Sequence, residues 1–360
     1  MSSGTSLHPA YHLRPNKAID RFMLIDVLRN IPLEKRKKYE YIGLGGPFLE
    51  DFKIMHHYYP EISLTSIEEN EDTFKRQKFN KSFRAINLVK SDIASYFSEH
   101  DEFGHPLVVW FDGTDFRQRT IENIITILNK LPIGSILKVT ARVSFETEPR
   151  YKEFASEVVQ ALNEYLKGTQ LSDEEQERLA LAIRNISDKV VISKDEMWLT
   201  MQTILDYLPE GYENMLEDQI SRAKLYHQIL RKAISSVYPN TGDNIFYLLS
   251  SNYYSDGTTM ISVTGMLVRR KDLSKVRKMF KSYQPQGDQL VTPTKIDVPV
   301  LSIKERMELD ALLPMRKNVG SRLYKALGYK IDSSRARTEA QLTFYNVFHK
   351  YYPFFSKIQL

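Results

Sequence analysis

The sequence predicts an α/β fold in which a parallel sheet is covered by helices on both faces. Up to about residue 150, short apolar segments alternate with segments of helical periodicity, as in parallel strands joined by crossover helices. Further along, two strand-like segments are separated by Ser255, Asp256 and Gly257, which is the signature of a β-hairpin. The predicted strands cover residues 39–43, 63–68, 85–89, 107–112 and 135–143, and the hairpin covers 244–254 and 258–268.

The remaining segments are mainly of helical pattern, and they suggest three parts of the chain. Residues 1–38 form an amino-terminal arm with a helix, and residues 39–268 form the main domain. Residues 145–232 are interpreted as a helical insertion into that domain, and residues 269–360 as a helical carboxy-terminal extension. Helices are expected at residues 16–29, 70–80, 121–131, 302–313 and 335–352.

Composition excludes several kinds of chemistry. The 360 residues include no cysteine, so disulfides, cysteine-ligated zinc, iron–sulfur clusters and cysteine nucleophiles are ruled out. The formal net charge of +5 is mild and does not by itself indicate nucleic acid. The amino terminus lacks the apolar core of a signal peptide, and no apolar run approaches membrane-spanning length. We therefore expect a cytoplasmic enzyme or binding protein without a membrane partner.

A glycine-rich turn follows the first predicted strand, in the segment YEYIGLGGPFLEDF. Gly43, Gly45 and Gly46 allow the backbone to pass close beneath a ligand, and the following helix offers free N–H groups to it. The alternative is a plain strand-to-helix turn that uses glycine for its conformation. The dinucleotide fingerprint G-x-G-x-x-G is not met, because its third glycine would fall at Phe48. The turn therefore predicts a nucleotide-like cofactor other than a dinucleotide.

The next three predicted strands each run into a carboxylate, at Glu68, Asp92 and Asp112. In open α/β sheets, ligands bind at the carboxyl ends of the strands, so these side chains are candidates for cofactor contacts. Alternatives exist for two of them. Glu68 could belong to a solvated acidic turn with Glu69 and Glu71, and Asp92 could cap the helix that follows it.

The order of these elements resembles that of the class I S-adenosylmethionine-dependent methyltransferases. Within that superfamily the segments LRPNK, at residues 13–17, and YIGLGGPFLEDF are similar to the bacterial putative O-methyltransferases. The resemblance extends over about residues 39–268 and implies a Rossmann-like class I methyltransferase sheet with S-adenosylmethionine as cofactor. The glycine turn departs from the commoner acidic-x-Gly-x-Gly-x-Gly form, because Glu40 lies three residues before Gly43 and Pro47 follows Gly46.

The resemblance also implies roles for individual cofactor-binding residues. The glycine turn would line the methionine and ribose part of the cofactor, and Glu68 would accept hydrogen bonds from both ribose hydroxyls. Asp92 would accept a hydrogen bond from the adenine amino group while Ile93 packs against the ring. Asp92 could cap the following helix and accept this hydrogen bond from adenine at the same time.

Asp112 lies nearest the expected methyl-transfer centre, and Asp115 is close enough to share its task. Either could hold the amino group of the cofactor's methionine part or deprotonate an acceptor hydroxyl. A divalent cation would need a third ligand, and no partner Asp or Asn is evident, so no metal is expected. Arg14, Asn16 and Lys17 stand where the first helix is expected to begin, and they would bind substrate if the amino-terminal arm folds back. The alternative for them is a polar lead-in.

Exclusion favours O-methylation of a hydroxyl or carboxyl group on a small molecule or protein. Covalent cytosine C5 methylation needs a cysteine, and residues 112–116 lack the Asn or Asp-Pro-Pro-aromatic loop of enzymes that methylate amino groups of DNA bases. One alternative is a catalytically degenerate cofactor-binding or interaction protein, and a homo-oligomer is compatible with either reading. A further alternative is an RNA-directed methyltransferase whose basic segment 269–281 contacts phosphates.

Overall fold

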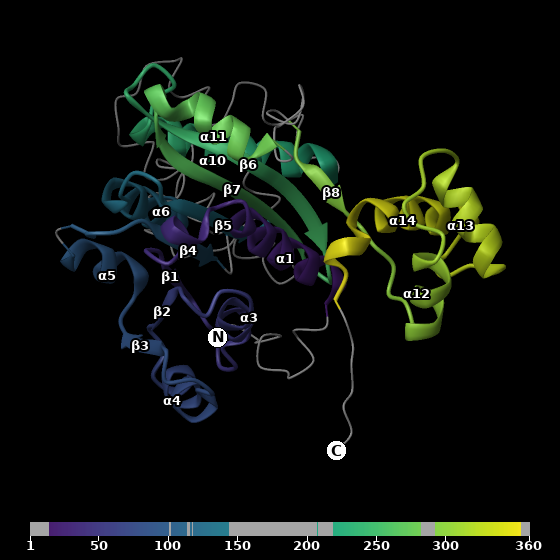
Figure 1. Cartoon of the computed structure of the whole chain (residues 1–360), viewed down its shortest axis with the longest axis horizontal. Coiled ribbons are helices and arrows are strands. Elements are labelled where there is room, and N and C mark those ends of the chain that lie inside the picture. Colours follow the sequence, from purple (N-terminus) through teal and green to yellow (C-terminus); the bar gives the residue numbers. More distant parts are fainter. Residues whose placement is uncertain are drawn as a thin grey trace, which may run out of the picture.

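The computed structural model describes residues 14–100, 102–113, 116, 118–143, 207, 219–281 and 292–353. These residues form an eight-stranded sheet with the order β3-β2-β1-β4-β5-β7-β6-β8 (Figure 1). Five strands are parallel, namely β1 (Glu40–Gly43), β2 (Ser63–Glu68), β3 (Ile86–Lys90), β4 (Leu107–Asp112) and β5 (Ile136–Arg142). The predicted parallel sheet is confirmed, and we call the edge at which these five strands end the carboxyl edge.

The predicted hairpin completes the sheet. Strand β7 (Thr259–Arg269) is antiparallel to both β5 and β6 (Asn244–Ser255), so the turn between β6 and β7 lies at the carboxyl edge. Gly257 in this turn has a φ of +102°, a backbone conformation that side chains disfavour. A short strand that the sequence did not predict, β8 (Thr294–Ile296), pairs parallel with the end of β6. It therefore also ends at the carboxyl edge.

Helices cover both faces of the sheet, as expected for parallel strands. Adjacent residues of β1 point to opposite faces: Tyr41 belongs to the buried apolar cluster on one face, and Ile42 to the cluster on the other face. The first face carries α1 (Pro15–Arg29), α3 (Glu50–Tyr58) and α11 (Leu273–Met279), and the second carries α5 (Ile93–Glu99), α6 (Gln118–Lys130) and α10 (Gln219–Val237). Smaller elements are α2 (Leu33–Arg36), α4 (Glu71–Asn80) beside β2 and β3, and the 3₁₀ turns η4 (Arg270–Asp272) and η7 (His349–Tyr351).

Most of the predicted helical insertion lies outside the described residues. Within residues 145–232 the structure describes Tyr207 and the part of α10 that begins at Gln219. Buried residues of α10, including Leu225 and Ile229, share an apolar cluster with Ile121 of α6. The end of the predicted insertion is therefore a helix of the main domain that helps to cover the sheet, and the insertion itself stays a prediction.

The carboxy-terminal helices form a group beyond the end of the sheet, which we call the carboxy-terminal lobe (Figure 1). It comprises α12 (Ile303–Asp310), α13 (Val319–Leu327) and α14 (Arg335–Phe348). Their buried side chains cluster with Ile19 of α1 and Tyr254 of β6, which joins the lobe to the sheet. The sequence analysis did not predict α13, a nine-residue helix that contains Gly320. A Cβ at Gly320 would lie 2.1 Å from the Glu339 carbonyl oxygen, so glycine permits α13 and α14 to touch.

Within the described part of the chain, no helix has the length and apolar character needed to cross a membrane.

Candidate active site

The glycine turn leaves β1 at the carboxyl edge, and its three glycines serve different purposes. Gly46 has a φ of +54°, and a Cβ built on it would meet nothing within 4 Å, so open space lies over this part of the turn. At Gly45, in contrast, a Cβ would lie 2.7 Å from the Ser66 Oγ, to which the Gly45 N–H donates at 3.3 Å. A Cβ on Gly43 would lie 3.0 Å from the hydroxyl of Tyr41. Gly45 is thus required for packing, while Gly46 borders open space, and a contact of this turn with a cofactor stays a prediction.

Glu68 is the last residue of β2 and lies at the same edge, half-buried. Its Oε1 accepts a hydrogen bond from the Asn70 N–H at 2.7 Å. Burial raises the pKa of Glu68, and the hydrogen bond from Asn70 opposes that shift. Because β2 pairs with β1 in the register Gly43–Ser66, this carboxyl group lies close to the glycine turn.

Asp92 is the N-cap of α5, which is one of the two roles considered for it. Its Oδ1 accepts hydrogen bonds from the N–H groups of Ala94 and Ser95, each at 3.1 Å. Hydrogen bonding by Ser95 is the largest contribution to a lowered pKa of Asp92. Ile93 is buried in the apolar cluster below. Contacts of Asp92 and Ile93 with adenine stay a prediction.

Asp112 forms an ion pair with Lys17, which the sequence analysis had named separately as a candidate for substrate binding. The distance from Lys17 Nζ to Asp112 Oδ2 is 2.7 Å, with 6% of the lysine side chain and 22% of the aspartate side chain exposed. Lys17 and Asn16 lie in the first turn of α1, so they belong to the helix and not to a polar lead-in before it. The beginning of α1 is therefore part of the site. Asp115 lies outside the described residues.

The β6–β7 turn holds the beginning of α1 in place through Asp256. The Asp256 carboxylate accepts hydrogen bonds from Asn16 Nδ2 at 2.9 Å and from the Lys17 N–H at 2.8 Å. Burial raises the pKa of Asp256, while these hydrogen bonds and the charge of Arg14 oppose the shift. The Asn16 Oδ1 in turn accepts from the Val298 N–H at 2.9 Å. Both ends of the Asn16 amide are therefore used to connect the helix, the hairpin and the lobe.

A second ion pair joins α1 to α3 next to the first. Arg21 Nε donates to Asp51 Oδ1, and both side chains are largely buried. Burial lowers the pKa of Arg21, but the Asp51 carboxylate outweighs it and the net shift is upward. Burial and the Asp51 charge together hold the pKa of Tyr41 well above its usual value. Arg21 also interacts electrostatically with Asp112, so the two ion pairs form one charged group at the carboxyl edge.

A third ion pair lies deeper under α1. Lys138, on β5, is 2.8 Å from Asp20 Oδ2, and the two side chains are 1% and 0% exposed. Lys138 Nζ also donates to Ser262 Oγ at 2.7 Å. The Asp20 oxygens make no well-aligned hydrogen bond, so charge rather than hydrogen-bond geometry holds this pair.

The sequence analysis missed Asp20, Arg21, Tyr41, Asp51 and Lys138. One signal was available for the two residues of α1. Lys17, Asp20 and Arg21 have the i, i+3, i+4 spacing of one helix face, and the buried Leu24 and Leu28 continue that face. Charged residues on the buried face of a helix require partners, and the sequence did not show which residues provide them.

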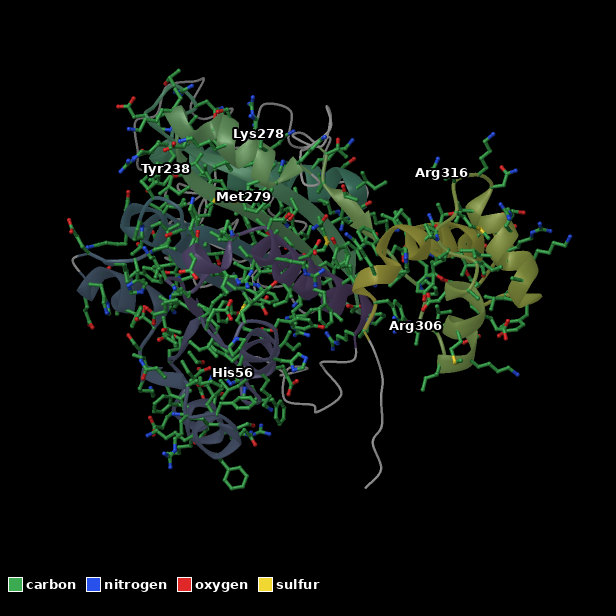
Figure 2. The ribbon with its side chains drawn as sticks, viewed as in Figure 1. His56, Tyr238, Lys278, Met279, Arg306 and Arg316 are labelled. Atoms are coloured by element: carbon green, nitrogen blue, oxygen red, sulfur yellow. The ribbon has the colours of Figure 1, made fainter. Side chains whose placement is uncertain are left out.

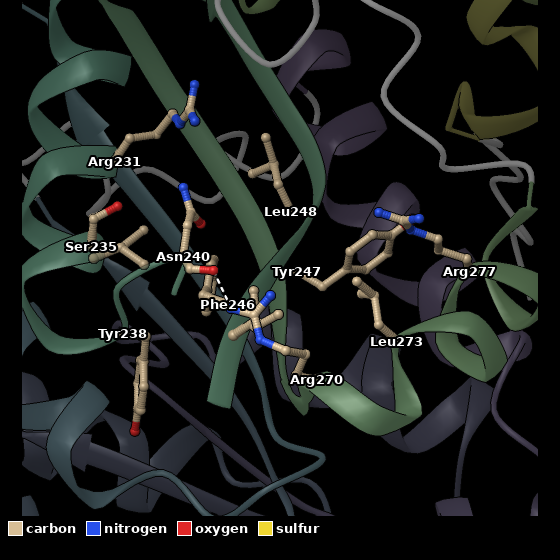
Figure 3. Close-up of a pocket in the computed structure, with 12 residues that line it drawn as sticks. Arg231, Ser235, Tyr238, Asn240, Phe246, Tyr247, Leu248, Arg270, Leu273 and Arg277 are labelled. Carbon is tan, nitrogen blue, oxygen red and sulfur yellow. Dashed lines mark hydrogen bonds between the residues drawn. The ribbon is translucent and has the colours of Figure 1, made fainter. Parts of the chain in front are cut away.

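A separate cavity of about 570 Å³ lies at the opposite edge of the sheet, between α10, β6 and α11 (Figure 3). Phe246 and Tyr247 line it. Tyr247 pairs with Met266, and Met266 pairs with Ile136, the first residue of β5. The cavity therefore lies at the edge where the parallel strands begin. The basic segment 269–281 borders this cavity. Arg270 donates to the carbonyl oxygens of Gly242, at 2.9 Å, and of Asn240. That segment therefore lies away from Asp112.

Among the residues that the structure describes, no group of three or more His, Asp or Glu side chains is placed to hold a metal ion.

Comparison with known proteins identifies the family. The model of a family described as putative O-methyltransferase matches residues 9–360. Solved structures similar to the chain include PigF with SAH (10% identity over 70% of this chain and 64% of that chain, TM-score 0.32) and an O-methyltransferase family protein from Burkholderia thailandensis (11% identity, 71% and 59%, TM-score 0.31). A third is the plantazolicin methyltransferase BamL in complex with triazolic desmethylPZN analog and SAH (9% identity, 71% and 88%, TM-score 0.32).

The chain spans 64% of the length of PigF, and no curated protein matches it. Five parallel strands completed by an antiparallel hairpin form the class I methyltransferase sheet, as the sequence resemblance implied. With its fold and nearly its whole length accounted for, the chain belongs to the family of putative O-methyltransferases.

Proposed function

We propose that this protein transfers a methyl group from S-adenosylmethionine to an oxygen atom of a hydroxyl or carboxyl acceptor. The observation that carries the proposal is the Lys17–Asp112 ion pair, with its 2.7 Å contact, at the carboxyl edge beside the open glycine turn. Methylation of a hydroxyl needs a group that accepts its proton and a positive charge near the developing oxyanion, whereas a carboxylate acceptor is already ionised and needs only the positive charge that binds it. This ion pair contains both the proton acceptor and the positive charge.

The residues at the carboxyl edge fit the cofactor. The space over Gly46 leaves room for a ligand beside its backbone, and the half-buried Glu68 presents a carboxyl group suited to ribose hydroxyls. Asp92 and Ile93 stand at the start of α5, where the resemblance places the adenine. S-adenosylmethionine supplies an electrophilic methyl group on a sulfonium, so the protein's own task is alignment and proton removal.

The charges around Asp112 favour oxygen over nitrogen as the acceptor atom. Lys17 and Arg21 place two cations near this centre. Positive charge stabilises an oxygen that becomes more negative as its proton leaves. A neutral amine instead becomes positive when it is methylated, and the same cations would oppose that change. In this proposal Asp112 receives the proton of a hydroxyl acceptor, and Lys17 stabilises the acceptor oxygen of a hydroxyl or a carboxylate.

Cofactor binding is tested first, by thermal unfolding with and without S-adenosylhomocysteine. We expect the ligand to raise the unfolding temperature, and Glu68→Ala to reduce that increase. Lys75→Ala, which removes an exposed lysine of α4 paired with Glu71, is the matched control and should retain the increase. Absence of any ligand-dependent increase in the folded wild-type protein would argue against the proposal.

Methyl transfer is tested with donor labelled in the methyl group and a cell extract as the source of acceptors. We expect labelled product with wild-type protein and about 100-fold less with Asp112→Asn. Base-labile label identifies a carboxyl ester, and base-stable label on oxygen identifies an ether. Label on nitrogen contradicts the proposed acceptor class. Cofactor binding without any labelled product would instead support the degenerate cofactor-binding protein.

A further inference from the structure

One surface of the carboxy-terminal lobe is strongly basic. Residues 311–331 include no Asp or Glu, and they carry Arg316, Lys317, Arg322, Lys325 and Lys330. All five side chains are exposed. They lie on α13 and on the loops that enter and leave it, and we call them the α13 surface. Arg316 lies on the lobe, beyond the end of the sheet (Figure 2).

None of the five cations has a carboxylate partner among the described residues. Some exposed basic residues of other helices do form local ion pairs, such as Lys37 with Glu34, Lys75 with Glu71 and Arg335 with Glu339. Cations gathered on one short helix and its flanking loops, without carboxylate partners, create a positive potential that attracts a polyanion. The charge of this surface is therefore complementary to a chain of phosphates.

The lobe is attached beside the candidate active site. It follows β8, which ends at the carboxyl edge, and its core includes Ile19 of α1, two residues after Lys17. The Asn16 Oδ1 accepts from the Val298 N–H at the start of the lobe. Arg316 lies on the lobe, beyond the end of the sheet, so a small acceptor bound at Asp112 would not extend to it (Figure 2). A ligand that contacts both the α13 surface and the candidate active site must therefore be an extended polymer.

Two further features favour a single-stranded nucleic acid. Helix α13 has nine residues and so extends for about 14 Å, a length that a few nucleotides can follow. Next to Lys330, Tyr329 is 48% exposed and offers a ring for base stacking. Its hydroxyl donates to Glu305 at 2.7 Å, and this carboxylate also caps α12.

We propose that the α13 surface binds the phosphate backbone of single-stranded RNA and presents the RNA to the carboxyl edge. The choice of RNA over DNA rests on the proposed function, because RNA carries a 2′-hydroxyl on every nucleotide and DNA does not. The earlier alternative placed phosphate contacts on segment 269–281. That segment borders the opposite edge of the sheet, so the proposal assigns the contacts to a different surface.

The test is fluorescence anisotropy of a labelled single-stranded RNA of about 20 nucleotides with the full-length protein. Arg322→Glu combined with Lys325→Glu should weaken binding by about tenfold or more and lower the slope of log K against log salt by about two. The matched control, Lys271→Glu with Lys278→Glu, reverses two exposed charges on segment 269–281 and should change affinity less than about twofold. Unchanged unfolding temperatures would show that both variants are folded.

The proposal is overturned by no RNA binding at about 50 mM salt, by equal losses in both double variants, or by a larger loss in the control. Equal or tighter binding of DNA of the same sequence rejects RNA as the occupant. Binding to phosphatidylserine vesicles without RNA binding rejects it in favour of a membrane surface. Cofactor-dependent thermal stabilisation, measured on the same proteins, separates these failures from a failure of the proposed methyl transfer.

Discussion

Helices α1 and α13 are both rich in charge, but they use it in opposite ways. On α1, Lys17 and Arg21 are buried and each is paired with a carboxylate from a distant part of the sequence. On α13, Arg322 and Lys325 are exposed and have no carboxylate partner within the described structure. A buried charge is tolerated only when a partner compensates for its lost hydration, whereas water does this for an exposed one. Buried charges therefore define a rigid site, and exposed charges are available to a ligand.

The largest effect is expected from the most deeply buried pair. Lys138→Met leaves the Asp20 carboxylate buried without its cation, and we expect a loss of about 3–5 kcal/mol in the free energy of unfolding, measured with urea. Asp20→Leu combined with Lys138→Met removes both charges and should recover most of that loss. Lys75→Met is the exposed control and should cost less than about 0.5 kcal/mol. If Lys138→Met behaves like this control, burial does not distinguish the two kinds of charge.

The next largest effect concerns catalysis. Lys17→Met removes the cation beside Asp112, and we expect kcat to fall by about 100-fold while S-adenosylhomocysteine still raises the unfolding temperature. The control is Lys275→Met, which removes an exposed lysine 3.2 Å from Asp272 and should leave kcat within about twofold. A loss of cofactor binding equal to the loss of kcat would instead assign Lys17 to the cofactor pocket.

An intermediate effect is expected at the junction of lobe and sheet. Asp297 is buried at 7% exposure and accepts from Arg337 Nη2 at 2.9 Å, with Lys295 at 2.8 Å. Burial raises the pKa of Asp297, but Arg337 and Lys295 outweigh it, so the folded-state pKa is lowered. The ionised carboxylate therefore stabilises the fold above the unfolded-state pKa of about 4, and this contribution is lost as pH falls through the lower folded-state value.

Asp297→Asn tests this expectation. At pH 6 we expect the variant to be less stable than wild type by about 1–2 kcal/mol, because both cations are partly exposed and solvent weakens the interaction. The gap should narrow below about pH 4 in urea unfolding measured from pH 6 to pH 3. A gap of constant size across this range would show that shape, and not charge, makes Asp297 important.

The smallest effect on stability is expected on α13. Arg322→Ser with Lys325→Ser should change the free energy of unfolding by less than about 0.5 kcal/mol per site, since neither cation has a partner to lose. Urea unfolding at low salt checks this. A destabilisation comparable to that of Lys138→Met would mean that these side chains have structural partners, and the contrast between α1 and α13 would fail.

The sequence predicted the strands well because each is an apolar segment bounded by turns or helices. Strands β2 and β4 have the predicted limits, and the hairpin around Gly257 was visible from its turn residues. Strand β8 was missed because three residues carry too little pattern. Helix α13 was missed because it is short and contains Gly320, which weakens a helical signal although close packing against α14 requires it.

The candidate site was only partly visible for a different reason. Glu68, Asp92 and Asp112 follow or end strands, so their places at the carboxyl edge follow from local pattern and topology. Arg21 and Asp51 gain their roles only by meeting each other, 30 residues apart in sequence. Lys17 was named as a candidate, but its pairing with Asp112 depends on where α1 packs.

By itself the sequence determined the α/β class, the glycine turn, the carboxylates at the strand ends and the family resemblance, because periodicity and turn chemistry are local properties. Only the tertiary structure decided which charges are buried together under α1, that Asp256 holds the beginning of this helix, and that the α13 cations remain exposed. Burial and ion pairing depend on contacts between residues far apart in the chain, and local pattern does not specify them.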